Sequence, residues 1–291
     1  MQAFAHIATA GLFMAGLGTA LGGVLALANR KLYVWEDPRI DEVEEMLPAT
    51  NCGACGTAGC RPFAEALIKG EVDPGECTVA TDEERQHIAD YLDVDVGEHE
   101  KRTARLACAG GSHVAHIRAH YDGLESCRAA SLVSGGGKGC TWGCLGFGDC
   151  EVVCDLDAIV MDANHVPVVI DALCTACGDC VDVCPRDLFS IHPQSHQLWV
   201  ACNNKETGAA AEAECEVICD GCGRCAIDAP EGLVRMENNL AIVDYDKNQL
   251  ATRIAIERCP TGAIVWIDEA QGVQKGIKAK KIIRRQPLPL G

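Results

Sequence analysis

The chain has 291 residues and a formal net charge of −17, so its length allows two or three domains and we expect no nucleic-acid partner. Only 4% of the residues are aromatic, whereas 20 are cysteines, which is about 7% of the chain and high for an intracellular protein. This composition argues against a large aromatic core and predicts a protein that folds around metal centres in a reducing compartment.

The chain begins with an apolar segment that is long enough to cross a membrane. Residues 7–28 contain no charged residue and no proline, and as a helix they would span about 33 Å, against about 30 Å for a bilayer core. Arg30 and Lys31 follow, and no lysine or arginine precedes the segment. The positive-inside rule therefore predicts a single-pass anchor over residues 1–31 in the cytoplasmic membrane, with the bulk of the chain on the cytoplasmic side. A cleaved signal peptide ending at Ala28 is the alternative, but it would lack a basic N-terminal region.

Residues 32–98 combine a short acidic connector with the first group of cysteines. This group consists of Cys52, Cys55, Cys60 and Cys77. The glycines between them let the backbone approach a metal centre closely. Thr81 and Glu84 form a capping-box pattern that predicts a helix reaching about Leu92. Spacing alone leaves open whether the four cysteines hold an iron–sulfur cluster or a structural zinc ion.

Residues 135–200 carry two consecutive runs of four cysteines. The second run has the spacing C-x2-C-x2-C-x3-C followed by Pro185, which is typical of bacterial ferredoxins. In such proteins the last cysteine of each run binds the cluster of the other run. The predicted ligands are therefore Cys140, Cys144, Cys150 and Cys184 for one [4Fe-4S] cluster, and Cys154, Cys174, Cys177 and Cys180 for the other. A pair of four-cysteine zinc sites is the alternative, which the spacing of the second run disfavours.

Residues 201–269 have the pattern of a second ferredoxin unit that has lost one of its two clusters. Ala229 stands where the crossing cysteine is expected, and residues 247–258 contain no cysteine. The predicted ligands of the remaining [4Fe-4S] cluster are Cys219, Cys222, Cys225 and Cys259. Residues 233–236, 240–243 and 264–267 are expected to be short strands of a βαββαβ unit. The predicted fold class is α+β, with one transmembrane helix, a small helical four-cysteine domain and two ferredoxin-like iron–sulfur units.

Four cysteines remain after these groups are assigned. They are Cys108 and Cys127, in the connecting segment 99–134, and Cys202 and Cys215, near the start of the second ferredoxin-like unit. We expect the two flanking segments to meet and the four thiols to build a fifth [4Fe-4S] cluster between the units, with Gly110 and Gly111 permitting a close approach. Four free buried thiols or a four-cysteine zinc site are the alternatives.

The charge of the chain changes sign after Glu269. Residues 270–291 contain six lysines and arginines and no acidic residue, which leaves a formal charge of −23 for residues 1–269. This tail is either a disordered end or an electrostatic contact for an acidic partner or lipid headgroups. His113, His116 and His120 have the spacing of one helical face, and ordinary surface histidines are a simpler interpretation of them than a metal site.

Several stretches resemble the B subunit of the Rnf membrane complex. They are residues 51–66 (NCGACGTAGCRPFAEA), 126–130 (SCRAA), 143–150 (GCLGFGDC) and 237–245 (ENNLAIVDY), the last typical of the longer, clostridial form. The resemblance covers about residues 5–268. It implies a [4Fe-4S] cluster on Cys52, Cys55, Cys60 and Cys77. It also implies soluble ferredoxin as electron donor, and integral-membrane and flavin-bearing sister subunits as partners.

The cysteine pattern and the resemblance lead to one main functional hypothesis. Cubane clusters with thiolate ligands pass single electrons. We expect the electron-carrying subunit of an Rnf-type translocase, which accepts electrons from ferredoxin for NAD+ reduction and Na+ or H+ transport and has no substrate-converting site of its own. The alternatives are a free-standing membrane-anchored polyferredoxin feeding another reductase and a zinc-stabilised membrane adaptor without a redox role. Brown colour would exclude the adaptor, and co-purification with flavin-bearing partners would exclude the free-standing polyferredoxin.

Overall fold

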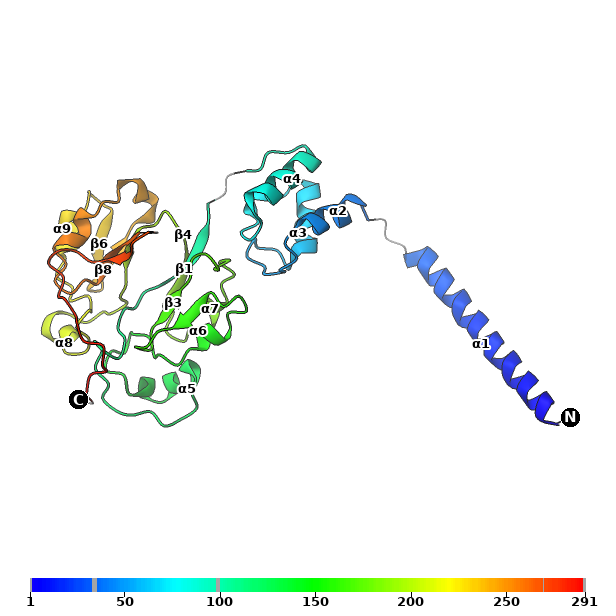
Figure 1. The fold of residues 1–291 in the computed structure, drawn as a ribbon, viewed down its shortest axis with the longest axis horizontal. Coiled ribbons are helices and arrows are strands. Elements are labelled where there is room, and N and C mark those ends of the chain that lie inside the picture. The colour runs from blue at the N-terminus through cyan, green and yellow to red at the C-terminus, as the bar shows by residue number, and fades with distance from the viewer. Residues whose placement is uncertain (1, 33–35, 98–99, 269, 290–291) are drawn as a thin grey trace.

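The computed structural model describes residues 2–32, 36–97, 100–268 and 270–289 (Figure 1). Residues 33–35 of the expected connector, and the expected domain boundaries at residues 98–99 and 269, lie outside these ranges. Figure 1 shows one long helix, then a small helical unit, then a larger body of short helices and small sheets. This mixed content of helices and strands is the α+β class that the sequence predicts.

The first helix is apolar along most of its length. α1 (Gln2–Leu32) contains the expected segment 7–28 and extends it at both ends, because the segment is rich in alanine and leucine and no proline interrupts it. Residues 11–32 are long and apolar enough to cross a membrane, and none of this stretch is buried against the rest of the chain. Arg30 and Lys31 lie in the last turn, where positive charge is favourable.

The small helical unit packs around one apolar core. Its elements are α2 (Arg39–Met46), α3 (Cys60–Lys69), the 3-10 helix η1 (Pro74–Glu76) and α4 (Asp82–Leu92). Val43, Phe63 and Ile88 are fully buried in this core. The predicted capping box is confirmed: Thr81 Oγ1 accepts a hydrogen bond from the Glu84 N–H at 3.2 Å, and the Glu84 carboxylate accepts one from the Thr81 N–H at 2.7 Å.

The first ferredoxin-like unit has two antiparallel strand pairs. Its strands are β1 (Arg102–Leu106), β2 (Ile159–Met161), β3 (Pro167–Val169) and β4 (Phe189–Pro193), and its helices are α5 (Cys127–Leu132), η2 (Ser134–Gly137), α6 (Asp149–Val152) and α7 (Asp179–Val183). β1 pairs with β4, and β2 pairs with β3. Ala104, Ile159 and Phe189 form a small buried core together with cysteine side chains. The cysteines are thus part of the packing of this unit.

The second unit repeats this arrangement. Its strands are β5 (Leu198–Val200), β6 (Val234–Glu237), β7 (Leu240–Val243), β8 (Ile264–Asp268) and β9 (Gly272–Gln274), and its helices are α8 (Gly208–Glu212), α9 (Arg224–Asp228), η3 (Tyr245–Leu250) and α10 (Ile254–Glu257). β5 pairs with β8, β8 pairs with β9, and β6 pairs with β7, all antiparallel. β6, β7 and β8 are the three strands that the sequence predicts, with bounds that agree to within one residue.

The strand pairing places the start of each unit earlier than the cysteine spacing does. β1 lies in the expected connecting segment 99–134, and β5 lies at the end of 135–200, the range expected for the first unit. β1 pairs with β4 and β5 pairs with β8, so the paired strands of the two units lie within residues 102–193 and 198–274. Both first strands are short and are separated from the cysteine runs by long insertions, so neither periodicity nor spacing marks them.

The two units contact each other through an aromatic cluster. His192 of β4 packs against Trp199 of β5 and Tyr245 of η3, with ring centroids 4.9 Å apart in both pairs. The Trp199 indole N–H donates to the carbonyl of Leu106 at 2.9 Å, which ties the second unit to β1. Burial lowers the pKa of His192 to about 4, so this ring is neutral at neutral pH and packs as an uncharged aromatic group.

The three histidines expected on one helical face do not share one, so this prediction is wrong. Residues 112–120 contain no helix. Ala115 instead forms a β-bridge with Cys215, and the His116 N–H donates to the carbonyl of Glu214 at 3.0 Å. Several of the backbone groups that a helix would use are therefore bonded to other segments of the chain.

Candidate metal centres

Sixteen of the 20 cysteines line four cavities of nearly equal size. Each has about 310–340 Å³ of space free of protein atoms, part of it open to solvent, and is lined by four cysteines, and no cysteine lines two of them. The four sets are Cys108, Cys140, Cys202 and Cys215; Cys127, Cys144, Cys150 and Cys184; Cys154, Cys174, Cys177 and Cys180; and Cys219, Cys222, Cys225 and Cys259. We call the first the junction cavity, because each ferredoxin-like unit contributes two of its cysteines.

The crossing expected for the two central runs is consistent with this division. Cys184, the last cysteine of the second run, lines the cavity of Cys144 and Cys150. Cys154, the last cysteine of the first run, lines the cavity of the second run instead. The final cysteine of each run therefore lines the cavity of the other run, as in two-cluster ferredoxins.

The cysteine sets that line the cavities differ from the sets expected from the sequence by the exchange of one cysteine. The spacing groups Cys140 with Cys144, Cys150 and Cys184, but the structure places Cys140 at the junction cavity. Cys127, one of the four cysteines that the spacing leaves over, takes its place at the other cavity. The expectation that the two flanking segments meet agrees with the structure, and the membership of the two sets is corrected by this exchange.

Three seven-residue loops with the same backbone explain the exchange. They are residues 144–150, 174–180 and 219–225, each with a cysteine at both ends. Their fifth residues are glycines with left-handed φ, namely Gly148 (+78°), Gly178 (+99°) and Gly223 (+69°). The middle residue is Cys177 or Cys222 in two of the loops, but it is Phe147 in the loop 144–150. This loop presents two cysteines rather than three, and Cys127 provides the missing sulfur.

Cys127 is held at this cavity by the loop that it completes. It is the first residue of α5, and Ser126 is the N-cap. The Asp149 carboxylate accepts hydrogen bonds from the Ser126 hydroxyl at 3.0 Å and from the backbone N–H groups of Cys127 at 2.9 Å and Arg128 at 3.1 Å. A carboxylate is favourable at a helix N-terminus. Because Asp149 directly precedes Cys150, these bonds fix the start of α5 against the same cavity.

The junction cavity is built from matching positions of the two units. Cys108 and Cys202 each lie two residues after the first strand of their unit, and each follows an alanine. Cys140 and Cys215 each stand four residues before the first cysteine of a seven-residue loop. This internal repeat is the sequence signal by which Cys140 could have been assigned to the junction.

The hydrogen bonds to the junction sulfurs repeat in the same way. Cys108 Sγ accepts the backbone N–H of Gly110 at 3.4 Å and that of Cys144 at 3.3 Å. Cys202 Sγ accepts the N–H of Asn204 at 3.4 Å and that of Cys219 at 3.3 Å. Cys144 and Cys219 line the two neighbouring cavities. One N–H···S bond therefore connects the junction cavity to the cavity on each side.

The environment of the thiols determines their charge before any metal binds. Burial raises the pKa of the Cys144 and Cys215 thiols to about 12, so both are neutral at neutral pH in the metal-free protein, and ligation would release their protons. Lys138 also lines the junction cavity, with its ammonium donating to the carbonyl of Gly110 at 2.6 Å. A cation in this position favours thiolates.

The remaining four cysteines lie in the small helical unit. Cys77 is buried in its core, and Cys55 and Cys60 pack against that core. Burial raises the pKa of the Cys77 thiol, and the nearby thiols of Cys55 and Cys52 add to the rise. Next to Cys77, the Thr78 hydroxyl donates to the carbonyl of Thr175 at 2.9 Å. Since Thr175 follows Cys174, this bond brings the helical unit against a cysteine loop of the first ferredoxin-like unit.

The arrangement of four cysteines around each cavity suits a group with several metal atoms. A tetrahedral zinc ion draws its four sulfurs to about 3.8 Å from one another, given a Zn–S bond of about 2.3 Å. Within the ranges that the structure describes, no three Cys, His, Asp or Glu side chains are close enough to share a single ion. Each cavity has four cysteines around it and predominantly apolar walls. This arrangement matches a cysteine-bound cubane cluster, which the ferredoxin spacing also predicts.

Comparison with protein families agrees with these sites. Residues 47–79, which include all four cysteines of the helical unit, match the family described as "Putative Fe-S cluster". Residues 167–189 match the family described as "4Fe-4S binding domain" and include the run from Cys174 to Cys184. Iron–sulfur chemistry, implied by the resemblance for the first region and by the spacing for the second, thus has support in both regions.

Similar proteins cover nearly the whole chain. The B subunit of the Na(+)-translocating ferredoxin:NAD(+) oxidoreductase complex of Acetobacterium woodii is 36% identical over 85% of this chain and 74% of its own length. The B subunit of the ion-translocating oxidoreductase complex of Methanosarcina acetivorans is 36% identical over 86% and 95%. The B subunit of the proton-translocating ferredoxin:NAD(+) oxidoreductase complex of Clostridium ljungdahlii is 36% identical over 90% and 93%. The chain therefore belongs to the family of B subunits of Rnf-type ion-translocating oxidoreductase complexes.

Proposed function

We propose that the chain binds five [4Fe-4S] clusters, one at each of the four cavities and one in the helical unit. The cavities supply the ligand sets given above, with Cys127 in place of Cys140 beside Cys144, Cys150 and Cys184. The helical unit supplies Cys52, Cys55, Cys60 and Cys77. Two observations support this assignment: every cysteine belongs to one set, and each set has four members. The corrected junction set is Cys108, Cys140, Cys202 and Cys215.

The clusters, when bound, supply one-electron transfer, and the chain is the electron-carrying subunit of its complex. The observation that carries this proposal is the pair of N–H···S bonds from Cys144 to Cys108 and from Cys219 to Cys202. These bonds join three of the four cavities, the junction cavity and one neighbour on each side, into one series across the two units. The names of the relatives support reduced ferredoxin as the donor, NAD+ as the final acceptor, and Na+ or H+ as the transported ion. No substrate is converted on this subunit itself.

This function predicts a brown chain that ferredoxin can reduce. The full chain, purified without oxygen, should lose its visible iron–sulfur absorbance when reduced ferredoxin is added. When it is co-expressed with the integral-membrane subunits of its complex, it should co-purify with flavin-bearing partners. A colourless chain that contains zinc would contradict the proposal, and so would a brown chain that reduced ferredoxin cannot bleach.

We propose further that α1 anchors the chain in the cytoplasmic membrane with its N-terminus outside. Arg30 and Lys31 at the end of the helix, with no basic residue before it, support this orientation. A cysteine introduced at Gln2 should react with a membrane-impermeant thiol reagent in intact cells, whereas one introduced at Glu45 should react only after lysis. The reverse labelling pattern, or a mature chain that starts after Ala28, would contradict it.

A further inference from the structure

The basic C-terminal segment is fixed along the body of the protein. We call residues 275–288 the C-terminal strap. Its backbone N–H groups donate to carbonyls of both units: Lys278 to Glu257 at 3.1 Å, Lys280 to Pro260 at 2.9 Å, and Leu288 to Ser112 at 2.9 Å. The strap therefore runs from the second ferredoxin-like unit to the insertion of the first, and these bonds hold its backbone in place.

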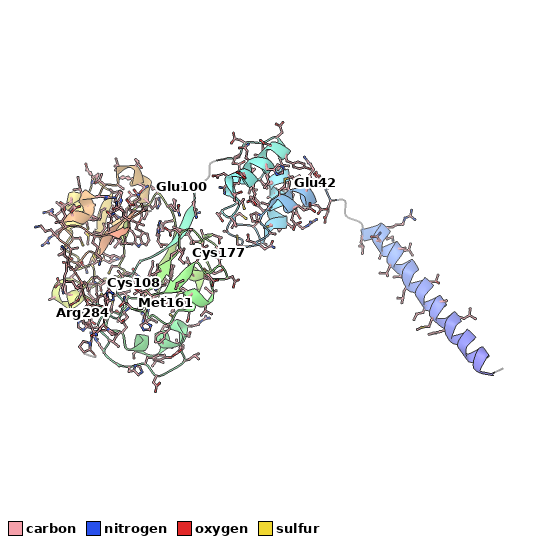
Figure 2. The ribbon with its side chains drawn as sticks, viewed as in Figure 1. Glu42, Glu100, Cys108, Met161, Cys177 and Arg284 are labelled. Carbon is pink, nitrogen blue, oxygen red and sulfur yellow. The ribbon has the colours of Figure 1, made fainter. Side chains whose placement is uncertain are left out.

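Glu216 anchors the middle of the strap. Its carboxylate pairs with the Lys280 ammonium at 3.1 Å and with the Arg284 guanidinium at 3.3 Å. The same guanidinium donates to the carbonyl of His113 at 2.9 Å. Figure 2 labels Arg284 near the C-terminal end of the chain and Cys108 in the body. Since Glu216 directly follows Cys215, the strap is attached next to a junction cysteine.

A groove lies between the strap and the body, directly behind the junction cavity. About 1080 Å³ of space free of protein atoms, part of it open to solvent, lies among its lining residues. Lys275, Lys280 and Lys281 lie on the strap side, and Ala109 and Val217 lie on the body side. Ala109 and Val217 also line the junction cavity. A partner seated in this groove would be separated from the junction sulfurs by this single layer of small side chains.

The strap presents cations that the chain itself does not neutralise. Lys278, Lys281 and Arg285 are exposed, and no acidic side chain among the described residues forms an ion pair with them. They belong to a segment of charge +6 on a chain whose other residues sum to −23. An acidic partner is repelled by most of this surface and attracted at the strap, so charge alone selects where it binds.

We propose that the strap and its groove are the docking surface for a small acidic electron-carrier protein, which delivers electrons to the junction site. This inference rests on the proposed electron-transfer function. The carrier is oxidised by one electron, the junction site is reduced by one, and no bond is broken. The position of the groove favours a protein over a membrane surface for two reasons. The groove is concave, and its floor is also the wall of a redox site. Binding of lipid headgroups would require neither feature.

Charge reversal on the strap tests this proposal. The triple variant Lys278→Glu, Lys281→Glu and Arg285→Glu leaves both partners of Glu216 in place. With a reduced acidic two-cluster ferredoxin as the probe, the second-order rate constant for reduction of the full chain at low salt should fall at least about tenfold. In the unmodified chain this rate constant should fall steeply as salt is added, and in the triple variant it should change little. Reduction by dithionite and iron content should be the same in both.

A matched control separates local docking from the overall change in charge. Lys69→Glu, Arg102→Glu and Arg235→Glu change the net charge equally, at exposed positions outside the strap, and should lower the rate constant much less. Equal rate constants for the two triple variants would overturn the docking surface while leaving the electron-transfer function intact. Unchanged reduction of the strap variant by ferredoxin would overturn it as well. If ferredoxin reduces no form of the chain although dithionite does, the proposed donor itself is wrong.

Discussion

Replacing Cys127 by alanine should remove the cluster of the first seven-residue loop, although Cys127 lies outside every cysteine run. The cavity that contains Cys144, Cys150 and Cys184 would then keep three sulfurs. Iron in the purified chain should fall from about twenty atoms by between one and four, depending on whether a three-iron cluster survives. Iron analysis together with electron paramagnetic resonance checks this result. Unchanged iron and an unchanged spectrum in Cys127→Ala would contradict the assignment.

The same loop provides a rescue that only this assignment predicts. Phe147 occupies the position that Cys222 occupies in the second unit, and its ring packs against Tyr121 with centroids 5.3 Å apart. Adding Phe147→Cys to Cys127→Ala should therefore restore the iron content and the four-iron spectrum. Adding it to Cys140→Ala should restore nothing, because Cys140 lines the junction cavity. If Phe147→Cys rescued the Cys140 variant rather than the Cys127 variant, Cys140 would have to be assigned as a ligand at the cavity of the first loop.

Replacing Cys215 by alanine should have the largest effect on the body as a whole. This change removes one of the two sulfurs that the second unit contributes to the junction, and structural metal sites contribute on the order of 10 kcal/mol to folding in small domains. The iron content should fall by as many as four atoms, and the contact between the two units should weaken. Limited proteolysis should then cut between residues 201 and 218 faster than it does in the unmodified chain.

Cys222→Ala is the matched control for this prediction. It removes a sulfur from the last cavity of the second unit and leaves the four junction cysteines unchanged. It should lose a similar amount of iron without becoming sensitive to protease between residues 201 and 218. If both variants are cleaved there equally fast, the junction site does not hold the two units together.

The cysteine spacing agrees with the lining of most of the cavities, and the reason is chemical. In the loop 174–180 and in the loop 219–225, three cysteines are close in sequence because the backbone curls around one cavity, so spacing reports geometry directly. In the loop 144–150 the middle sulfur comes from α5, about 20 residues earlier in the chain. Nothing in the spacing indicates such a distant ligand. Only a comparison of the three loops, position by position, reveals that Phe147 stands where a cysteine is expected.

The fold was predictable where side chains follow a pattern and less so where pairing is distant. β6, β7 and β8 alternate or contain β-branched residues, and the helix after Thr81 has a capping box, so these elements are visible in the sequence. β1 and β5 are defined only by their partners, β4 and β8, which lie more than 60 residues away. The spacing of the three histidines indicated a helix, but spacing contains no information on the neighbouring chain segments that bind their backbone.

The positions of the cysteines along the chain also set an order of completion during synthesis. The set of the helical unit is complete at residue 77, the two sets of the first unit at 180 and 184, the junction set at 215 and the last set at 259. The junction set encloses both sets of the first unit in the sequence, so its last cysteine is synthesised only after every cysteine of those two sets. The strap is synthesised last, when all four cysteines of the junction cavity are already part of the chain. A chain released before residue 275 could thus load all five sites and still lack the surface that receives the donor.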